Sequence, residues 1–315
     1  MKTISSQDQD RLPIGVLVLV RDEERNLPDC LHSVSGWAAQ VVVMVDSRTR
    51  DNSRSVAINA GAEVHERPFD TYAGQKNWAL DHVNWRGEWI LIIDADERVP
   101  PELVAELAQI VDDPNALEGY AVRKRFIFYG AWMKHCWHSS WDLRFFKRDK
   151  ARYENRKVHE HMQVDGRVGY LKADVIHNDF KDLDSWIAKH NRYATLEADE
   201  IVEYRKDGHF QGRLFGSKLE RRRLLKERLW AHLPFRPIWL FLYLYFLKLG
   251  FLDGALGLRF CVWHSVFDFF ITGKAWERRF VERHGVPNYY RRVLNDHFRH
   301  NPEARRFYRE MEERV

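Results

Sequence analysis

Cysteine is scarce in this chain of 315 residues. Its three cysteines, Cys30, Cys136 and Cys261, lie far apart and form no Cys-x-x-Cys pair. This spacing argues against a disulfide scaffold and a zinc site, and it fits a reducing cytosol. The polar residues 1–13 lack the apolar core of a signal peptide. We therefore expect a disordered N-terminal tail on a protein that stays inside the cell.

Excess charge and long apolar runs are also absent. The formal net charge is only +4, which does not indicate a nucleic-acid partner. Hydrophobic residues make up 45% and charged residues 30%, which argues against disorder. Lys248, Asp253 and Arg259 interrupt the most apolar segment, residues 237–273. No stretch therefore reaches the roughly 18–20 uninterrupted residues expected of a spanning helix.

What the sequence does contain is a close alternation of short apolar runs and amphipathic segments. The predicted strands are residues 14–20, 41–45, 63–65 and 89–93, and the predicted helices are residues 26–34, 53–60, 77–83 and 102–111. Alternation of this kind predicts βαβ units and an α/β fold with a Rossmann-like, mostly parallel sheet. Ligands bind such sheets beyond the carboxyl ends of the strands.

The strongest chemical signal lies at the end of the 89–93 strand. Asp94 and Asp96 are two residues apart there and are followed by Glu97. Mg²⁺ and Mn²⁺ prefer oxygen ligands and are often held by one or two carboxylates together with substrate phosphates. A solvated acidic turn is the alternative, but the strand and the polar residues upstream favour a metal site.

Four segments, in order along the chain, carry a resemblance to a known family. They are residues 19–27 (LVRDEERNL), 45–53 (VDSRTRDNS), 73–79 (AGQKNWA) and 94–97 (DADE). Together they resemble glycosyltransferase family 2, whose members have the GT-A fold. Two later segments, residues 143–147 (LRFFK) and 158–160 (VHE), are most similar to the bacterial lipopolysaccharide-core β-glucosyltransferases. The resemblance covers roughly residues 14–180, which we expect to form the catalytic domain.

The resemblance implies a donor site for a nucleotide sugar, with a UDP-sugar favoured. Asp46 would accept from the ring imide of a uracil-type base, and Val20 and Glu23 would line the base and ribose pocket. Asp94 would bind the ribose, and Lys76 the ribose or the diphosphate. Asp46 and Glu23 could instead cap loops, and Lys76 could be a solvated helix lysine.

The family pattern is not followed everywhere. Asp22 stands where asparagine is usual, and Arg48 and Arg50 stand where small residues are common. These departures leave the base and the sugar of the donor open. Arg144 is a candidate to pair with the diphosphate, and a structural ion pair is the alternative.

The resemblance also implies a metal and a base. Asp96 would ligate Mg²⁺ or Mn²⁺ at the diphosphate, and His177 would complete the site unless it is a core or capping histidine. Inverting transfer needs a carboxylate to deprotonate the acceptor hydroxyl. The best match is Glu160, and Asp142 is the second candidate.

Residues 181–315 are expected to be a helical C-terminal region. A basic helix at 217–232 precedes the apolar segment 237–273. This order predicts an interfacial anchor on anionic lipid, inserted shallowly. A helical bundle packed on the catalytic domain or on a second copy of the chain is the alternative, so a homo-oligomer stays open.

We therefore expect an inverting, metal-dependent glycosyltransferase on the cytoplasmic face of the inner membrane. Its acceptor would be a lipid-linked saccharide of the lipopolysaccharide core or a related surface glycan. A nucleotidyltransferase of similar topology needs a glycine-rich loop after the first strand, but residues 21–27 are acidic and contain no glycine. A non-catalytic membrane adaptor is disfavoured by the intact acidic residues.

Overall fold

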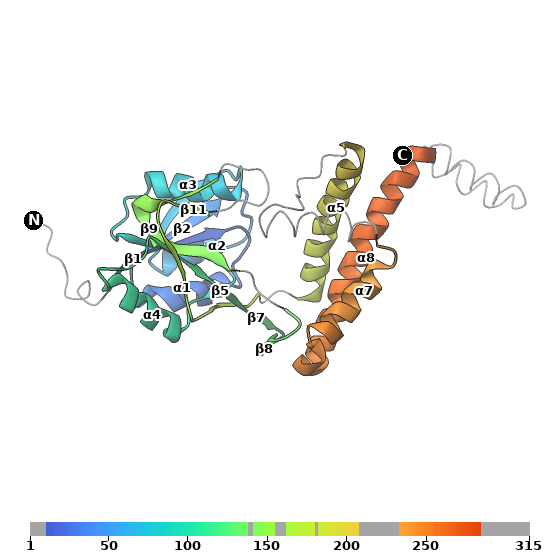
Figure 1. Ribbon diagram of the computed structural model, residues 1–315. Coiled ribbons are helices and arrows are strands. Elements are labelled where there is room, and N and C mark those ends of the chain that lie inside the picture. Colours follow the sequence, from blue (N-terminus) through green and yellow to red (C-terminus); the bar gives the residue numbers. More distant parts are fainter. Residues whose placement is uncertain (1–10, 138–140, 155–161, 180–181, 208–232, 285–315) are drawn as a thin grey trace, which may run out of the picture. The chain divides into compact units, whose positions relative to one another are not determined.

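The computed structural model describes residues 11–137, 141–154, 162–179, 182–207 and 233–284 (Figure 1). The chain divides into two compact units. The first comprises Met1–Asp182 together with Leu244–Phe260, and the second comprises Leu183–Tyr243 together with Cys261–Val315.

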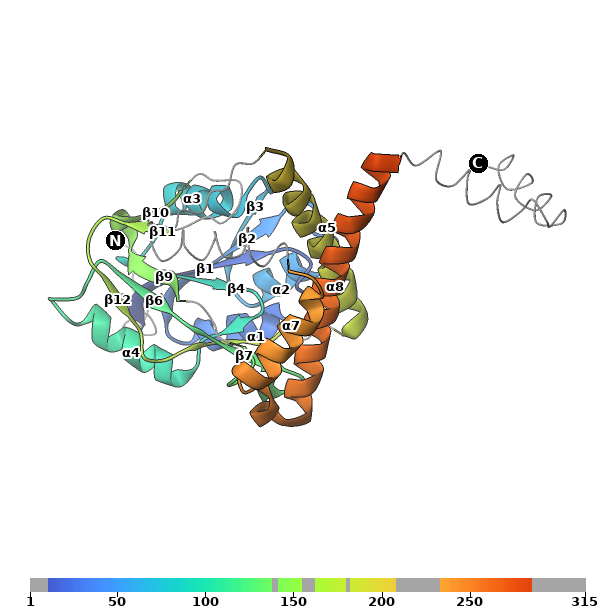
Figure 2. The ribbon, with the colours of Figure 1, turned by 45° about the vertical axis from the view of Figure 1, so that its right-hand side comes forward.

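A seven-stranded sheet forms the centre of the first unit, with strand order β12-β6-β9-β4-β1-β2-β3 (Figure 2). The strands are β1 (Leu12–Val20), β2 (Ala38–Asp46), β3 (Glu63–Arg67), β4 (Trp89–Asp94), β6 (Gly119–Val122), β9 (Asp142–Lys147) and β12 (Val168–Tyr170). β1 pairs in parallel with β2 and β4, and β2 pairs in parallel with β3. Only β9 runs antiparallel to its neighbours in the described sheet, β4 and β6. The predicted α/β fold with a mostly parallel sheet is confirmed.

Helices cover both faces of this sheet because successive strand residues point to opposite sides. The helices are α1 (Leu27–Ser35), α2 (Ser53–Asn59), α3 (Tyr72–His82) and α4 (Pro101–Val111). Val16 and Val18 of β1 belong to the core shared with α1, α2 and α4, whereas Leu17 belongs to the core shared with α3. Each fully buried aliphatic side chain of this kind stabilises the fold by about 1.5–3 kcal/mol.

A smaller sheet brings distant segments together beside the main one. It has the order β5-β13-β7-β8 and consists of β5 (Glu97–Arg98), β13 (Val175–His177), β7 (Lys124–Phe128) and β8 (Ala131–Trp132). His177 lies opposite Glu97 on one side and Phe126 on the other. A two-stranded ribbon, β10 (Ala151–Tyr153) with β11 (Met162–Val164), follows the short 3₁₀ helix η1 (Arg148–Lys150).

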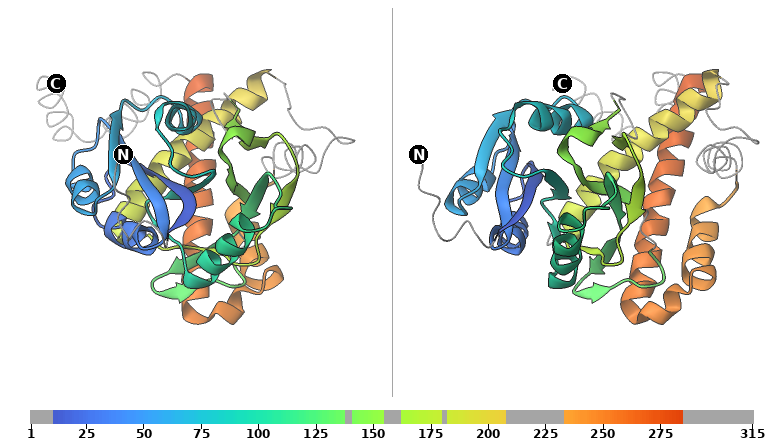
Figure 3. Two further views of the ribbon diagram at one scale, coloured as in Figure 1. Left: turned by 90° about the vertical axis from the view of Figure 1, so that its left-hand side faces the viewer. Right: turned by 60° about the vertical axis from the view of Figure 1, so that its left-hand side comes forward.

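The C-terminal part of the chain is helical where it is described. It contains α5 (Leu183–Asp207), α7 (Arg236–Leu242), the π-helical turn η4 (Tyr243–Leu247), the 3₁₀ turn η5 (Gly250–Asp253) and α8 (Gly254–His284). In the second unit α5 and α8 lie side by side (Figure 3), joined by the ion pair of Asp199 with Arg278. Arg236 of α7 forms a buried ion pair with Asp268 of α8.

One helix in the described part, Gly250–His284, is long and apolar enough to cross a membrane by length and composition alone. A third of its most apolar window is buried against the rest of the protein. Core helices of soluble proteins pass the same test, so length and composition do not decide between the two environments. The predicted basic helix at 217–232 lies outside the described residues.

Candidate active site

The predicted acidic residues meet at one edge of the main sheet. β1 lies between β4 and β2, so the strand order reverses there, and such a switch point is where open α/β sheets bind ligands. Leu19 pairs with Asp94, and Val20 pairs with Val45, the residue before Asp46. Val20, Asp46 and Asp94 are therefore brought together at the carboxyl ends of three adjacent strands.

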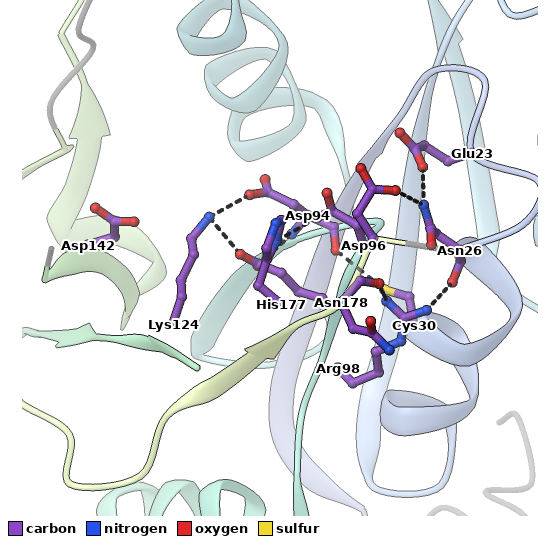
Figure 4. A network of polar contacts seen from close by, with 12 residues as sticks. Glu23, Asn26, Cys30, Asp94, Asp96, Arg98, Lys124, Asp142, His177 and Asn178 are labelled. Carbon is purple, nitrogen blue, oxygen red and sulfur yellow. Dashed lines mark hydrogen bonds and ion pairs between the residues drawn. The ribbon is translucent and has the colours of Figure 1, made fainter. Parts of the chain in front are cut away.

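A buried ionic cluster is built around Glu97, which is fully buried. One of its carboxylate oxygens lies 2.7 Å from Nζ of Lys124, and the other lies 2.7 Å from a guanidinium nitrogen of Arg144. The second oxygen also accepts the backbone N–H of Asp94 at 2.8 Å. Lys124 and Arg144 each reach the Asp94 carboxylate at 3.1 Å as well, and Figure 4 shows Lys124 pointing at Asp94. The cluster fixes the turn that follows β4.

The pKa values of Asp94 and Glu97 shift in opposite directions in this cluster. Burial would raise the pKa of Asp94, but the positive charges of Arg144, Lys124 and Lys76 outweigh it and hold that pKa well below its ordinary value. Burial raises the pKa of Glu97, against the opposing charge of Arg144. Asp94 is therefore a carboxylate at neutral pH, and its side chain is 40% exposed at the edge of the cluster.

Asp96 and His177 form a second pair beside this cluster. Their Oδ1 and Nδ1 atoms lie 3.3 Å apart, and both side chains are largely buried. The backbone N–H of Asn178 donates to the carbonyl of Asp96 at 2.9 Å, which holds the two strands in register. Phe126 stacks on the other face of the imidazole, with ring centroids 5.3 Å apart. Burial would lower the pKa of His177, but the hydrogen bond and the charge of Asp96 raise it.

The residues at this point fit a divalent cation. Asp96, Glu97 and His177 each place one ligand atom within 4.8 Å of the others. Glu97 already accepts from Lys124, Arg144 and a backbone N–H, so Asp96 and His177 are the better ligands. They offer a carboxylate oxygen of the kind that Mg²⁺ and Mn²⁺ prefer, together with an imidazole.

The two loops that follow β1 and β2 are interlocked. Asp22 has a positive φ of 55° and accepts the backbone N–H of Arg50 at 2.8 Å. The hydroxyl of Ser53 accepts the backbone N–H of Glu23 at 2.8 Å. The side chain of Glu23 in turn accepts from Asn26, which is fully buried. These contacts give the loop a fixed shape and leave Glu23 turned toward α1 (Figure 4).

The Asp46 carboxylate is already held by arginine. Nε and an Nη nitrogen of Arg48 donate to its two oxygens at 3.1 and 2.8 Å, and Arg21 lies 3.6 Å away. The hydrogen bond from Arg48 lowers the pKa of Asp46, against the effect of burial. Both arginine side chains are about half exposed, at 51% and 49%. The cations at this carboxylate are therefore free to turn toward solvent.

The remaining predicted residues lie as follows. Lys76 in α3 has its Nζ 4.5 Å from the centroid of the Tyr153 ring, and its charge acts on Asp94. Asp142 in β9 lies 3.7 Å from Arg144. Arg144 binds carboxylates in the structure, so its contact with a diphosphate stays a prediction. Glu160 lies outside the described residues.

Two site residues had no assigned role in the sequence analysis. Glu97 was part of the acidic motif, but its function as the anchor of the cluster depends on cations from distant strands. Lys124 lies in a stretch whose three consecutive residues Arg123, Lys124 and Arg125 are all basic, and nothing in the sequence marks the middle one. Its pairing with Val175 places it beside the site.

Comparisons with known proteins agree with this architecture. The family model described as Glycosyl transferase family 2 matches residues 15–175, half of the chain. The chain is 31% identical over 214 residues to a protein named Lipopolysaccharide core biosynthesis glycosyltransferase LpsC from Rhizobium meliloti (strain 1021), covering 65% of this chain and 77% of that one.

One further relative and one solved structure are also similar to the chain. The chain is 26% identical to an uncharacterized glycosyltransferase of Rickettsia prowazekii (strain Madrid E), over 70% of this chain and 75% of that one. The crystal structure of S. aureus TarS residues 1–349 superposes with a TM-score of 0.40 at 13% identity, over 85% of this chain and 92% of that one.

Proposed function

Because the chain belongs to glycosyltransferase family 2, and is a glycosyl-transferring enzyme, we propose that it moves a sugar with inversion from a UDP-sugar to a lipid-linked glycan. The observation that carries this proposal is the meeting of Asp46, Asp94 and the Asp96–His177 pair at the switch point of the sheet. The similarity to a lipopolysaccharide core glycosyltransferase supports a lipopolysaccharide core or related surface glycan as acceptor.

The donor would lie across the carboxyl ends of β1, β2 and β4. In this proposal Asp46 accepts from the imide of the base, with Val20 and Glu23 beside it, and Asp94 binds the ribose. Arg48 would have to turn away from Asp46, and its half-exposed side chain supports such a movement. Lys76 and Arg144 would contribute positive charge toward the diphosphate.

A divalent cation held by Asp96 and His177 would supply further positive charge where the departing diphosphate gathers negative charge. The chain's own residues are already arranged around that point. Glu97 is neutralised by two cations, so it holds the turn in place without repelling the diphosphate. Phe126 covers one face of His177 and fixes the direction of its ring.

The chemical step requires a base on the acceptor side. We propose that Glu160 takes the proton from the acceptor hydroxyl as its oxygen forms a bond to the anomeric carbon. The bond from that carbon to the diphosphate breaks on the opposite face, which inverts the configuration. Asp142 is the second candidate for the base, and its carboxylate lies 3.7 Å from the guanidinium of Arg144.

We further propose that residues 14–180 act as the catalytic domain and that residues 181–315 hold the enzyme at the cytoplasmic face of the inner membrane. The apolar helix Gly250–His284 and the basic sequence of residues 217–232 support this location. Anionic lipid would attract the basic segment, and apolar side chains would insert beside it.

The test is donor turnover by the Asp96→Asn variant. With a panel of UDP-sugars and Mn²⁺, we expect release of UDP to fall at least about 100-fold relative to the parent, since a catalytic cation contributes several kcal/mol. Mn²⁺ should also no longer raise the melting temperature. Asp165→Asn, at a residue with an 88% exposed side chain, is the control and should change neither. Full activity of Asp96→Asn, or activity indifferent to chelator, would refute the metal assignment.

A further inference from the structure

Two turns of the first unit hold bulky apolar residues in a conformation that favours glycine or asparagine. The first turn joins β7 to β8, where Phe128 pairs with Ala131 across the two residues Tyr129 and Gly130. Both turn residues have positive φ, 49° and 79°, which makes a type I′ turn. Asparagine followed by glycine is the preferred sequence for this turn. Tyr129 instead places a ring there that is 61% exposed.

The second turn lies between η4 and η5. Leu249, the residue directly before η5, has φ 59°, a left-handed conformation in which glycine and asparagine are usual. Its side chain is 44% exposed. Leu247 and Leu252 in the same turn are 77% and 56% exposed. Folding alone favours small or polar residues at both turns, so the exposed apolar side chains point to a role outside the fold.

The two turns belong to one edge of the first unit. The carboxylate of Asp253, at the end of η5, accepts the backbone N–H groups of Lys134, His135 and Cys136 at 2.9–3.1 Å. Phe260 at the start of α8 packs against Phe128, with ring centroids 5.4 Å apart. Figures 1 and 2 show β7 beside the first turns of α8.

Two cations lie against the ring of Trp132 at this edge. The ring of Trp132 is 40% exposed and has Arg125 4.4 Å and Lys134 5.1 Å from its centroid. Lys248 stands between Leu247 and Leu249 in the sequence. Exposed leucine, aromatic rings and flanking basic residues are the combination found at the boundary of acyl chains and anionic headgroups.

We propose that this edge, formed by Tyr129, Trp132, Leu247, Leu249 and Leu252, inserts into one leaflet of an anionic bilayer. This inference rests on the proposed function, because the inserted edge would present the site to a lipid-linked acceptor. β7 begins at Lys124 in the site and ends beside the inserted turn, five residues at about 3.3 Å each. The site would then lie on the order of 17 Å along this strand from the inserted edge.

The test uses the full chain and sedimentation with vesicles of neutral lipid, with and without 30% phosphatidylglycerol as a roughly physiological anionic fraction. Tyr129→Asn and Leu249→Asn should each weaken binding to anionic vesicles about tenfold, because each removes one inserted apolar side chain. Both variants should melt at the same temperature as the parent or higher, because asparagine suits a positive φ. Ile58→Asn, at a 52% exposed residue of α2, is the matched control and should bind as the parent does.

A local probe separates this edge from any other lipid-binding segment. The three native cysteines are buried, so a cysteine at position 249 can be labelled selectively with an environment-sensitive dye. Leu249→Cys should show a blue shift of its dye on anionic vesicles, whereas Ile58→Cys should not. A dye at position 249 that stays in water would overturn the proposal.

Turnover of soluble UDP-sugar, measured in parallel, separates this proposal from the proposed function. Donor turnover without vesicle binding, or binding of both asparagine variants as tight as that of the parent, would reject the inserted edge alone. Vesicle binding that depends on Tyr129 and Leu249 without donor turnover would reject the glycosyltransferase mechanism alone. If the asparagine variants instead turn a dimer into a monomer in the absence of vesicles, the edge is a contact between two copies and the proposal is wrong.

Discussion

Two carboxylate–arginine clusters lie at the same edge of the main sheet, and they differ in how firmly their cations are held. Glu97 is paired with Lys124 and Arg144, whose side chains are 21% and 12% exposed. Asp46 is paired with Arg48 and Arg21, whose side chains are about half exposed. Buried ion pairs are costly to break, because the remaining charge is left without water, whereas exposed pairs contribute little. The buried Glu97 cluster therefore supports the site, whereas the exposed cations at Asp46 leave a position that a ligand can occupy.

The largest expected effect is on stability, from Glu97→Gln. This change removes the buried anion between Lys124 and Arg144 and leaves them with the partly exposed carboxylate of Asp94. Breaking a buried ion pair costs about 3–5 kcal/mol of unfolding free energy. Urea denaturation measures the loss. Glu102→Gln is the control, because Glu102 is half exposed and pairs with Arg125. This variant should leave the free energy of unfolding nearly unchanged. Equal losses in the two variants would mean that the Glu97 cluster is not a support.

The next largest effect is on turnover, and it tests whether the catalytic base is Glu160 or Asp142, which contacts the buried cluster. Glu160→Gln keeps the shape of the side chain but removes its basicity, so turnover should fall about 10²–10⁴-fold with donor binding nearly unchanged. Asp142→Asn, at the residue that touches the cluster through Arg144, should have a much smaller effect on turnover. Single-turnover kinetics with saturating donor make the measurement. A silent Glu160→Gln together with a large loss in Asp142→Asn would reverse the assignment.

A smaller effect is expected at the open cluster, from Asp46→Asn. The neutral amide can still accept from a base but loses the charge, so the KM for a UDP-sugar should rise about tenfold. The melting temperature should change little, because the arginines that lose their partner reach solvent. A large fall in melting temperature with unchanged KM would place Asp46 with Glu97 as a structural residue.

The smallest effect is expected from Arg48→Gln. Removing a side chain that competes with the donor for Asp46 should lower the KM for the UDP-sugar by a few-fold and leave the melting temperature unchanged. Arg54→Gln, at an exposed arginine of α2 paired with Glu66, is the control. A higher KM in Arg48→Gln would mean that Arg48 itself binds the donor. Arg48 would then leave Asp46 in order to contact the donor.

Local sequence patterns predicted one of these clusters better than the other. Asp46 and Asp94 end apolar strands, so their meeting at one edge follows from the parallel sheet that the pattern itself predicts. The pairing of Arg48 with Asp46 was not predicted, although the two residues are only two positions apart, because Arg48 stood out only as a departure from the family pattern. The Glu97 cluster instead depends on Arg144, 47 residues away, and on the antiparallel placement of β9. Pairing between strands so far apart in the chain produces no repeating pattern of residues from which it could be predicted.

The apolar C-terminal segment shows the same limit. Its composition predicted a helical, membrane-associated region, but not that residues 244–260 belong to the first unit. That placement depends on Asp253, which accepts three backbone N–H groups from residues 134–136. A lone aspartate in an apolar run indicates that the run has a polar partner elsewhere. Here the partner is a loop that binds Asp253 through three backbone N–H groups and the imidazole of His135, and the backbone groups have no sequence signature.

The contact of Asp253 with the loop at His135 also sets an order for biosynthesis. The two residues are 118 positions apart, so at about 5–20 residues per second the ribosome takes roughly 6–24 s to supply the partner of that loop. Until then the nascent chain carries the strands of the small sheet without the segment that secures them. The same segment carries the exposed side chains of Leu247, Leu249 and Leu252, so the closing of the first unit coincides with their emergence from the ribosome. A bilayer or a chaperone near the ribosome exit would therefore meet the chain at the moment when its first unit closes.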